Sequence, residues 1–145
     1  MLEYLIDGNN LLGKIPHLKN LKINVAVEKL IFLIENSFVN KKVRITIFLD
    51  GYPLDVIKSK LNLVYSFSKS ADEIIKEKIK QSRRNKNIIV ISSDLEVYSF
   101  AKEYGCSAIK SEEFYKNYLT KKFENTEEKP SIGNIEEFKK LFNTD

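Results

Sequence analysis

Hydrophobic positions along the chain follow two spacings, one typical of strands and one typical of helices. Five short segments rich in β-branched or aromatic residues predict strands, over residues 3–6, 42–49, 61–67, 87–91 and 107–110. Between them, apolar residues recur every three or four positions, as in the run from Val27 to Phe38, which predicts amphipathic helices. This alternation predicts right-handed crossovers and a three-layer α/β/α sandwich around a mainly parallel sheet of about five strands.

Polar residues with capping chemistry indicate where the helices begin. The residues expected to cap helices are Asn24, the pair Ser70 and Glu73, and the pair Ser93 and Glu96. The first Ser–Glu pair opens a helix over about residues 71–82, and the second opens a helix that stops at Gly105. A further helix is expected over about residues 112–122.

A polar segment near the C-terminus divides the chain. Residues 124–133 contain Pro130 and have the composition of a linker, and a short helix through Phe142 is expected after them. We therefore expect one domain over residues 1–123, with residues 124–145 forming a linker and a helical arm packed on that domain. The 145 residues, 43% of them hydrophobic, suit a single domain with its own core.

The composition argues against several classes of protein. The longest apolar runs have about five residues, whereas a transmembrane helix needs roughly 20. Glu3 and Asp7 lie where a signal peptide would carry positive and then apolar residues, so we expect a cytoplasmic protein without a membrane partner. One cysteine and one histidine cannot supply an internal disulfide or a zinc site. The net charge of +4 permits an acidic partner such as RNA without requiring one.

Aspartate follows three of the predicted strands, at Asp7, Asp50 and Asp94. Because the carboxyl ends of parallel strands share one edge of a sheet, we expect these acids to lie together, with Asp72 reaching the same edge from a helix. A hard cation such as Mg²⁺ or Mn²⁺ would make such a cluster tolerable, and it would support hydrolysis of a phosphodiester. The alternative is structural, because Asp–Gly forms turns and Asp is favoured in the first turn of a helix.

A basic segment follows Asp72 in the sequence. Six cations lie within 11 residues, at Lys76, Lys78, Lys80, Arg83, Arg84 and Lys86. They are candidates for contact with RNA phosphates, and a solvated helix face is the alternative explanation. Tyr52, Tyr65 and Phe67 are candidates for stacking on unpaired bases near the acids, with packing into the core as the alternative.

Four motifs in this order resemble the YacP-like group in the NYN branch of PIN-like nucleases. They are residues 5–11 (LIDGNNL), 48–52 (FLDGY), 70–75 (SADEII) and 91–94 (ISSD), and residues 128–130 and 138–142 are similar to that group's C-terminal segment. The resemblance covers nearly the whole chain. It implies a PIN-like fold and an endoribonuclease that depends on Mg²⁺ or Mn²⁺. Our leading hypothesis is cleavage of single-stranded RNA, with mRNA on the ribosome as one candidate substrate.

The resemblance also implies roles for individual residues. The implied metal-binding acids are Asp7, Asp72 and Asp94, with Asp50 as a fourth or supporting acid. Asn10 matches the asparagine of the family's first motif, which implies that it positions Asp7 or the phosphate. Ser93 is implied to orient Asp94 or a bound water.

Two positions depart from the family's pattern. Asn9 replaces the usual aromatic residue of the first motif, and Lys76 stands where relatives often have a further acid. Lys76 motivates an alternative hypothesis, an RNA- or ribosome-binding module with a degenerate, non-catalytic site. A phosphoacceptor domain built on Asp50 is a third hypothesis, but the adjacent acid pair expected after the first strand of such domains is missing from this sequence.

Overall fold

The computed structural model describes residues 1–53 and 57–120. These residues form a five-stranded sheet in which every pair of neighbouring strands is parallel. The strands are β1 (Leu2–Asp7), β2 (Val43–Leu49), β3 (Asn62–Tyr65), β4 (Ile88–Ile91) and β5 (Ser107–Ile109). Their order across the sheet is β3-β2-β1-β4-β5. The prediction of a parallel sheet of about five strands is confirmed.

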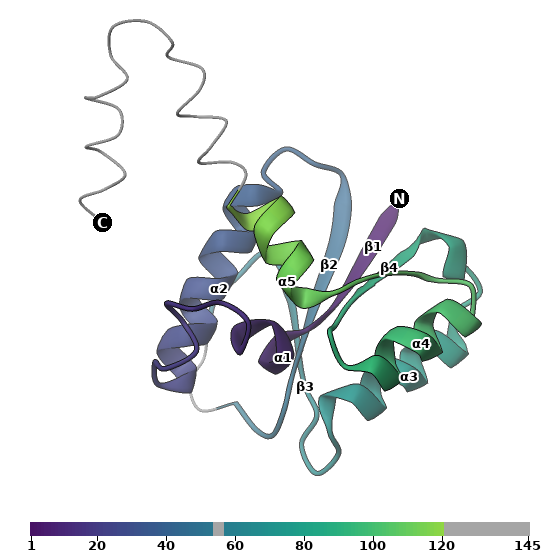
Figure 1. Ribbon diagram of the computed structural model, residues 1–145, viewed down its shortest axis with the longest axis horizontal. Coiled ribbons are helices and arrows are strands. Elements are labelled where there is room, and N and C mark those ends of the chain that lie inside the picture. Colours follow the sequence, from purple (N-terminus) through teal and green to yellow (C-terminus); the bar gives the residue numbers. More distant parts are fainter. Residues whose placement is uncertain (54–56, 121–145) are drawn as a thin grey trace, which may run out of the picture.

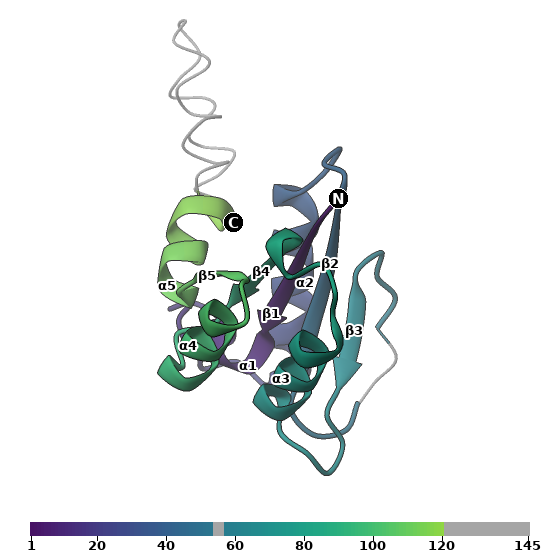
Figure 2. The same cartoon turned by 90° about the vertical axis from the view of Figure 1, so that its right-hand side faces the viewer.

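Helices cover both faces of this sheet (Figures 1 and 2). The α-helices are α1 (Gly8–Leu12), α2 (Ile23–Ser37), α3 (Ala71–Gln81), α4 (Leu95–Glu103) and α5 (Ser111–Phe114). A short 3₁₀ turn (Asn85–Asn87) precedes β4, and a π-helical turn (Tyr115–Leu119) continues α5. In the described part of the chain, none of the helices has the length and apolar character needed to cross a membrane.

Alternate residues of each central strand pack into two separate cores. Tyr4 and Ile6 of β1 pack with α1, α2 and α5, whereas Leu5 between them packs with α3 and α4. The alternation follows from the strand geometry, in which successive side chains point to opposite faces. The predicted three-layer sandwich is therefore confirmed.

Two of the predicted helix caps are wrong. Helix α2 begins at Ile23 after Lys22, so Asn24 lies inside its first turn. Helix α4 is capped by Asp94, whose Oδ1 accepts hydrogen bonds from the backbone N–H groups of Glu96 and Val97, and not by Ser93. By contrast, the predicted capping box at the start of α3 is present in full.

The Asp7–Gly8 pair, which has the composition of a turn, opens a short helix, α1, that lies close against β2. A Cβ atom on Gly8 would lie 2.7 Å from the carbonyl oxygen of Phe48 and 2.7 Å from Cδ2 of Leu49. Such distances are far shorter than ordinary contacts, so only glycine fits at this position. Gly8 therefore sets how closely the chain after Asp7 approaches the neighbouring strand.

The predicted C-terminal segments lie outside the described residues. These are the end of the helix expected to reach residue 122, the linker over 124–133, the helix through Phe142 and the similar segments 128–130 and 138–142. The division of the chain at residue 123 therefore stays a prediction.

The strand order reverses at β1, and this defines a particular place in the fold. The chain proceeds from β1 outward to β2 and β3, and then crosses back to add β4 and β5 on the other side of β1. In open parallel sheets, ligands bind outside the carboxyl ends of the strands at such a reversal. The carboxyl ends of β1 and β4, where Figure 1 shows β1 running into α1, are therefore the expected place for a site.

Candidate functional site

Asp7, the last residue of β1, is a buried acid at this point of reversal. The residue is only 7% exposed, and its Oδ2 accepts a 2.8 Å hydrogen bond from the hydroxyl of Ser92, which directly follows β4. Burial raises the pKa of Asp7 to about 6, the nearby charges of Asp50 and Asp94 contribute to the rise, and the Ser92 hydrogen bond opposes it. A buried carboxyl with a raised pKa at such a place is a functional-site candidate.

Asp50, at the end of β2, joins three parts of the edge. Its Oδ1 accepts a 2.8 Å hydrogen bond from the backbone N–H of Ala71, the first residue of α3. Its own backbone N–H donates to Oδ1 of Asn9 at 2.9 Å. Asp50 therefore ties β2 to both α1 and α3, while its charge still acts on Asp7.

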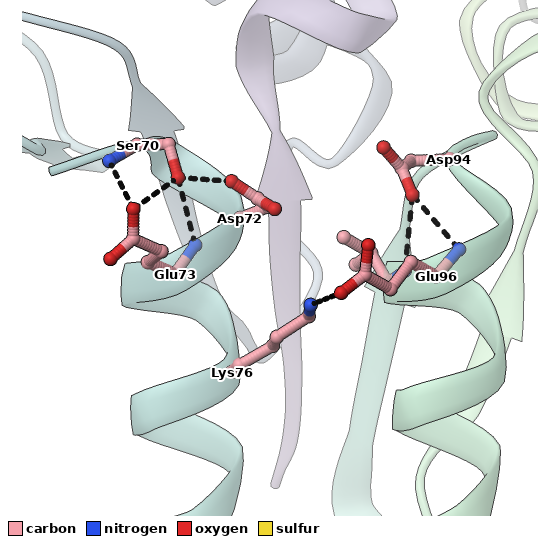
Figure 3. Close-up of polar contacts among 7 residues, drawn as sticks. Ser70, Asp72, Glu73, Lys76, Asp94 and Glu96 are labelled. Atoms are coloured by element: carbon pink, nitrogen blue, oxygen red, sulfur yellow. Dashed lines mark hydrogen bonds and ion pairs between the residues drawn. The ribbon is translucent and has the colours of Figure 1, made fainter.

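Asp72 and Asp94 face each other from the first turn of α3 and the start of α4 (Figure 3). The Ser70 hydroxyl donates a hydrogen bond to Asp72. Lys76 extends from α3 across to Glu96 on α4 and forms an ion pair with it. This contact raises the pKa of Lys76, and the charges of Asp72 and Asp94 add to the effect. Lys76 therefore places a positive charge among the acids of these two helices.

A second hydrogen-bonded group lies beyond β4, on the other side of Asp7. Oδ1 of Asn10 accepts hydrogen bonds from the backbone N–H of Ser93 at 2.9 Å and from the hydroxyl of Ser111 at 2.7 Å. The hydroxyl of Ser93 donates to Glu112 and accepts from the backbone N–H of Ser111. Asn10 and Ser93 thus tie α1, β4 and α5 together through these hydrogen bonds, and their roles beside Asp7 and Asp94 stay predictions.

The basic segment is divided between two ends of α3. Lys76 lies near the acids, whereas Lys78 pairs with Glu3 at the start of β1, at 3.5 Å, and Arg84 lines a hollow with Met1 and Ile88 at the opposite edge of the sheet. An 11-residue helix is about 16 Å long, so this helix separates Arg83, Arg84 and Lys86 from the acids. The six cations therefore do not form one patch beside the acids, and their contact with RNA stays a prediction.

Two of the three candidate stacking aromatics are displayed at the surface near Asp50. Tyr52 is 61% exposed and Phe67 is 55% exposed, and their rings meet edge to face with centroids 5.1 Å apart. Tyr65, by contrast, packs partly buried against the core under α2.

No three Asp, Glu, His or Cys side chains within residues 1–53 and 57–120 form a ready-made metal site. The donor set nevertheless suits a hard divalent cation, because it consists of carboxylates. Mg²⁺ is commonly held by one or two carboxylates together with waters and a substrate phosphate. The raised pKa of Asp7 shows an acid whose charge a cation would stabilise. A metal held jointly by Asp7, Asp50, Asp72 and Asp94 stays a prediction.

Three residues of the site were not found from the sequence, namely Ser92, Glu96 as an ion-pair partner and Glu112. Ser92 had a usable signal, since it is the first polar residue after a continuous apolar strand and is placed like Asp7 and Asp50. Glu112 and Glu96 had none, because their partners are far away in the sequence and are set by the packing of helices.

Comparisons with known proteins give one consistent result. A family model described as "YacP-like NYN domain" matches residues 4–142. A crystal structure of Rae1 (YacP) from Bacillus subtilis is similar, with a TM-score of 0.69 and 23% identity over 99% of this chain and 92% of that chain. A mutant form of the same protein has a TM-score of 0.72 and 22% identity over 95% of this chain and 90% of that chain. No curated protein sequence matches.

Proposed function

Because the chain belongs to the YacP-like NYN domain family, we propose that it is a divalent-metal-dependent endoribonuclease that hydrolyses phosphodiester bonds in single-stranded RNA. Family membership suggests a ribonuclease-like function and an RNA substrate. The observation that carries the proposal is the buried Asp7 at the reversal of the strand order, with Asp50 and Asp94 close enough to raise its pKa. We further propose mRNA on the ribosome as one candidate substrate.

The residues that would hold the cofactor are Asp7, Asp72 and Asp94, with Asp50 in support. When bound with a phosphate of the RNA, Mg²⁺ or Mn²⁺ supplies an activated water and neutralises charge that develops on the phosphodiester. The chain's own residues keep the acids in place. The Ser92 hydroxyl fixes Oδ2 of Asp7, and the first backbone N–H groups of α4 fix Oδ1 of Asp94.

Lys76 favours a second candidate function, an RNA- or ribosome-binding module without catalysis. Its ammonium group lies near Asp72 and Asp94 and pairs with Glu96, so part of the acidic charge is already compensated without a metal ion. A module of this kind would bind RNA equally well with and without divalent cations.

The two functions are separated by incubating the purified protein with end-labelled single-stranded RNA, with and without Mn²⁺. We expect cleavage only with the metal, and a loss of about 100-fold or more in Asp7→Asn and Asp94→Asn. Asn caps a helix as well as Asp does, so Asp94→Asn should keep the fold of α4. Glu28→Gln, an exposed acid on α2, is the matched control and should cleave normally.

Undiminished cleavage by Asp7→Asn, or cleavage that persists in excess chelator, contradicts the proposal. RNA binding that is independent of metal, with no cleavage of any RNA tested, identifies the binding module instead.

A further inference from the structure

A small pocket opens beside Asp50, on the β2 side of the acids. Its volume is about 150 Å³, and its apolar walls include Val27 of α2, Leu49 of β2 and Ile57. Pockets for whole drug-sized ligands are larger, roughly 300–1,000 Å³. This pocket, called the Leu49 pocket below, therefore has room for one flat ring rather than for a complete nucleotide.

The Leu49 pocket also carries polar groups that connect it to the acids. Asp50 and Asn9 both line it, and Oδ1 of Asn9 accepts the hydrogen bond from the backbone N–H of Asp50. Asn24 adds a second residue with an amide side chain. Apolar walls with a few amide groups suit a nucleobase, which presents flat apolar faces and a hydrogen-bonding edge.

An exposed aromatic pair lies beside this pocket. Tyr52 lines the pocket, and its ring meets the ring of Phe67. Phe67 has a φ of 58°, a conformation that is unfavourable for a bulky residue, and its backbone N–H donates to the carbonyl of Gly51 at 2.8 Å. The fold thus holds a strained backbone that leaves an aromatic ring in solvent, and exposed aromatic rings are the groups on which unpaired bases stack.

We propose that the Leu49 pocket receives one unpaired nucleobase of the RNA strand whose phosphodiester lies at Asp7, with Tyr52 and Phe67 stacking on that base or its neighbour. This inference rests on the proposed function, because it takes the acids as the place of the phosphate. Asp50 and Asn9 are shared by the pocket and the acidic edge, so the base and the phosphate would lie on one continuous surface. The pocket is then a determinant of substrate choice that favours single strands, since a paired base cannot enter it.

Binding measured in chelator tests this inference without catalysis. The probes are a fluorescein-labelled single-stranded RNA octamer and an abasic octamer with the same ribose-phosphate chain. We expect the wild type to bind the RNA about tenfold more tightly than the abasic chain, because stacking strengthens binding at each base. Tyr52→Ala, and Ile23→Glu at the exposed rim of the pocket, should reduce this ratio to about twofold or less. The added charge repels both chains equally, so only the apolar contact with the base is lost from the ratio.

Phe32→Ala is the matched control, because Phe32 is 64% exposed on α2 and does not line the pocket. Its ratio should equal that of the wild type. A ratio that is unchanged in Ile23→Glu overturns the inference.

A measurement on the wild type alone avoids any dependence on the variants. Titration with uridine, cytidine, adenosine and guanosine, followed by NMR, should shift the side-chain amide signals of Asn9 and Asn24 for at least one nucleoside. If neither residue shifts with any nucleoside, the inference that the Leu49 pocket receives a nucleobase is wrong. If RNA cleavage requires Asp7 but the nucleosides do not shift the Asn9 and Asn24 signals, only the pocket inference is wrong. If the nucleosides shift these signals but the protein cleaves no RNA, only the proposed nuclease activity is wrong.

Discussion

The Ser92 hydroxyl donates a hydrogen bond to Oδ2 of Asp7, with 2.8 Å between the two oxygens, although the two residues are 85 positions apart in the chain. The bond joins the ends of β1 and β4 where the strand order reverses. It is made to an acid that burial and neighbouring charges hold at a pKa of about 6. The acid with the raised pKa is therefore also the residue that links the two halves of the sheet.

The raised pKa of Asp7 predicts how stability depends on pH in the metal-free protein. The folded state disfavours the ionised carboxyl, so the free energy of unfolding should fall as the pH rises from about 4 to about 6 and then level off. Relative to the ordinary aspartate pKa of 3.8, the cost at pH 7 is about 3 kcal/mol at most. Asp7→Asn should abolish this loss and be more stable than the wild type at pH 7.

Chemical denaturation in excess chelator at about pH 4 and pH 7 measures this effect. Glu28→Gln should keep the pH dependence of the wild type. If Asp7→Asn loses as much stability between the two pH values as the wild type does, Asp7 is not the responsible group.

The positive charge of Lys76 is predicted to replace part of the charge that a bound metal ion would supply. Its side chain is 19% exposed, whereas that of its partner Glu96 is 75% exposed, so the ion pair itself should contribute less than about 1 kcal/mol to stability. Lys76→Met should leave Asp72 and Asp94 uncompensated, so Mg²⁺ should raise the melting temperature of the variant more than that of the wild type. Thermal melts with and without Mg²⁺ check this.

Lys78→Met is the control for this prediction, because Lys78 lies on the same helix and pairs with Glu3 away from the acids. An equal Mg²⁺-dependent rise in Lys76→Met and the wild type would show that Lys76 does not compensate the acids.

Arg83 and Arg84 are predicted to contact RNA phosphates beyond the acidic edge. Arg83→Glu combined with Arg84→Glu should weaken binding of single-stranded RNA and lower the slope of log affinity against log salt by about 1.4, or about 0.7 for each phosphate that is no longer neutralised. Fluorescence anisotropy over a range of salt concentrations measures the slope. Lys29→Glu with Lys116→Glu changes the charge equally on the other helical layer and should leave the slope unchanged. The same slope in both double variants would identify the arginines as part of a solvated face.

Gly8 is predicted to be required for the position of α1. Gly8→Ala should destabilise the protein by roughly 1–3 kcal/mol, because the new methyl group would press on the backbone of Phe48. Gly13→Ala, at the end of the same helix, would meet no atom closer than 3.5 Å and should be nearly neutral. Denaturation midpoints of the two variants give the comparison, and equal midpoints would mean that β2 yields to the methyl group without cost.

The sequence by itself determined the elements of the fold and the kinds of residue at its edge. Hydrophobic spacing is a local property, so it located the strands, the layers and the capping box at Ser70 and Glu73. The parallel arrangement followed from the alternation of strands and helices, and it brought the aspartates at or just after the ends of β1, β2 and β4 to one edge.

The tertiary structure alone decided which of these residues touch. Ser92 meets Asp7, Asn10 meets Ser111, and Lys76 meets Glu96 because strand order and helix packing bring distant segments together. The Ser93 hydroxyl contacts Ser111 and Glu112, while Asp94 caps α4, which local spacing did not reveal. The length of α3 separated cations that are neighbours in sequence. Local periodicity fixes which face a residue occupies, but its contacts depend on distances across the sheet that no local pattern encodes.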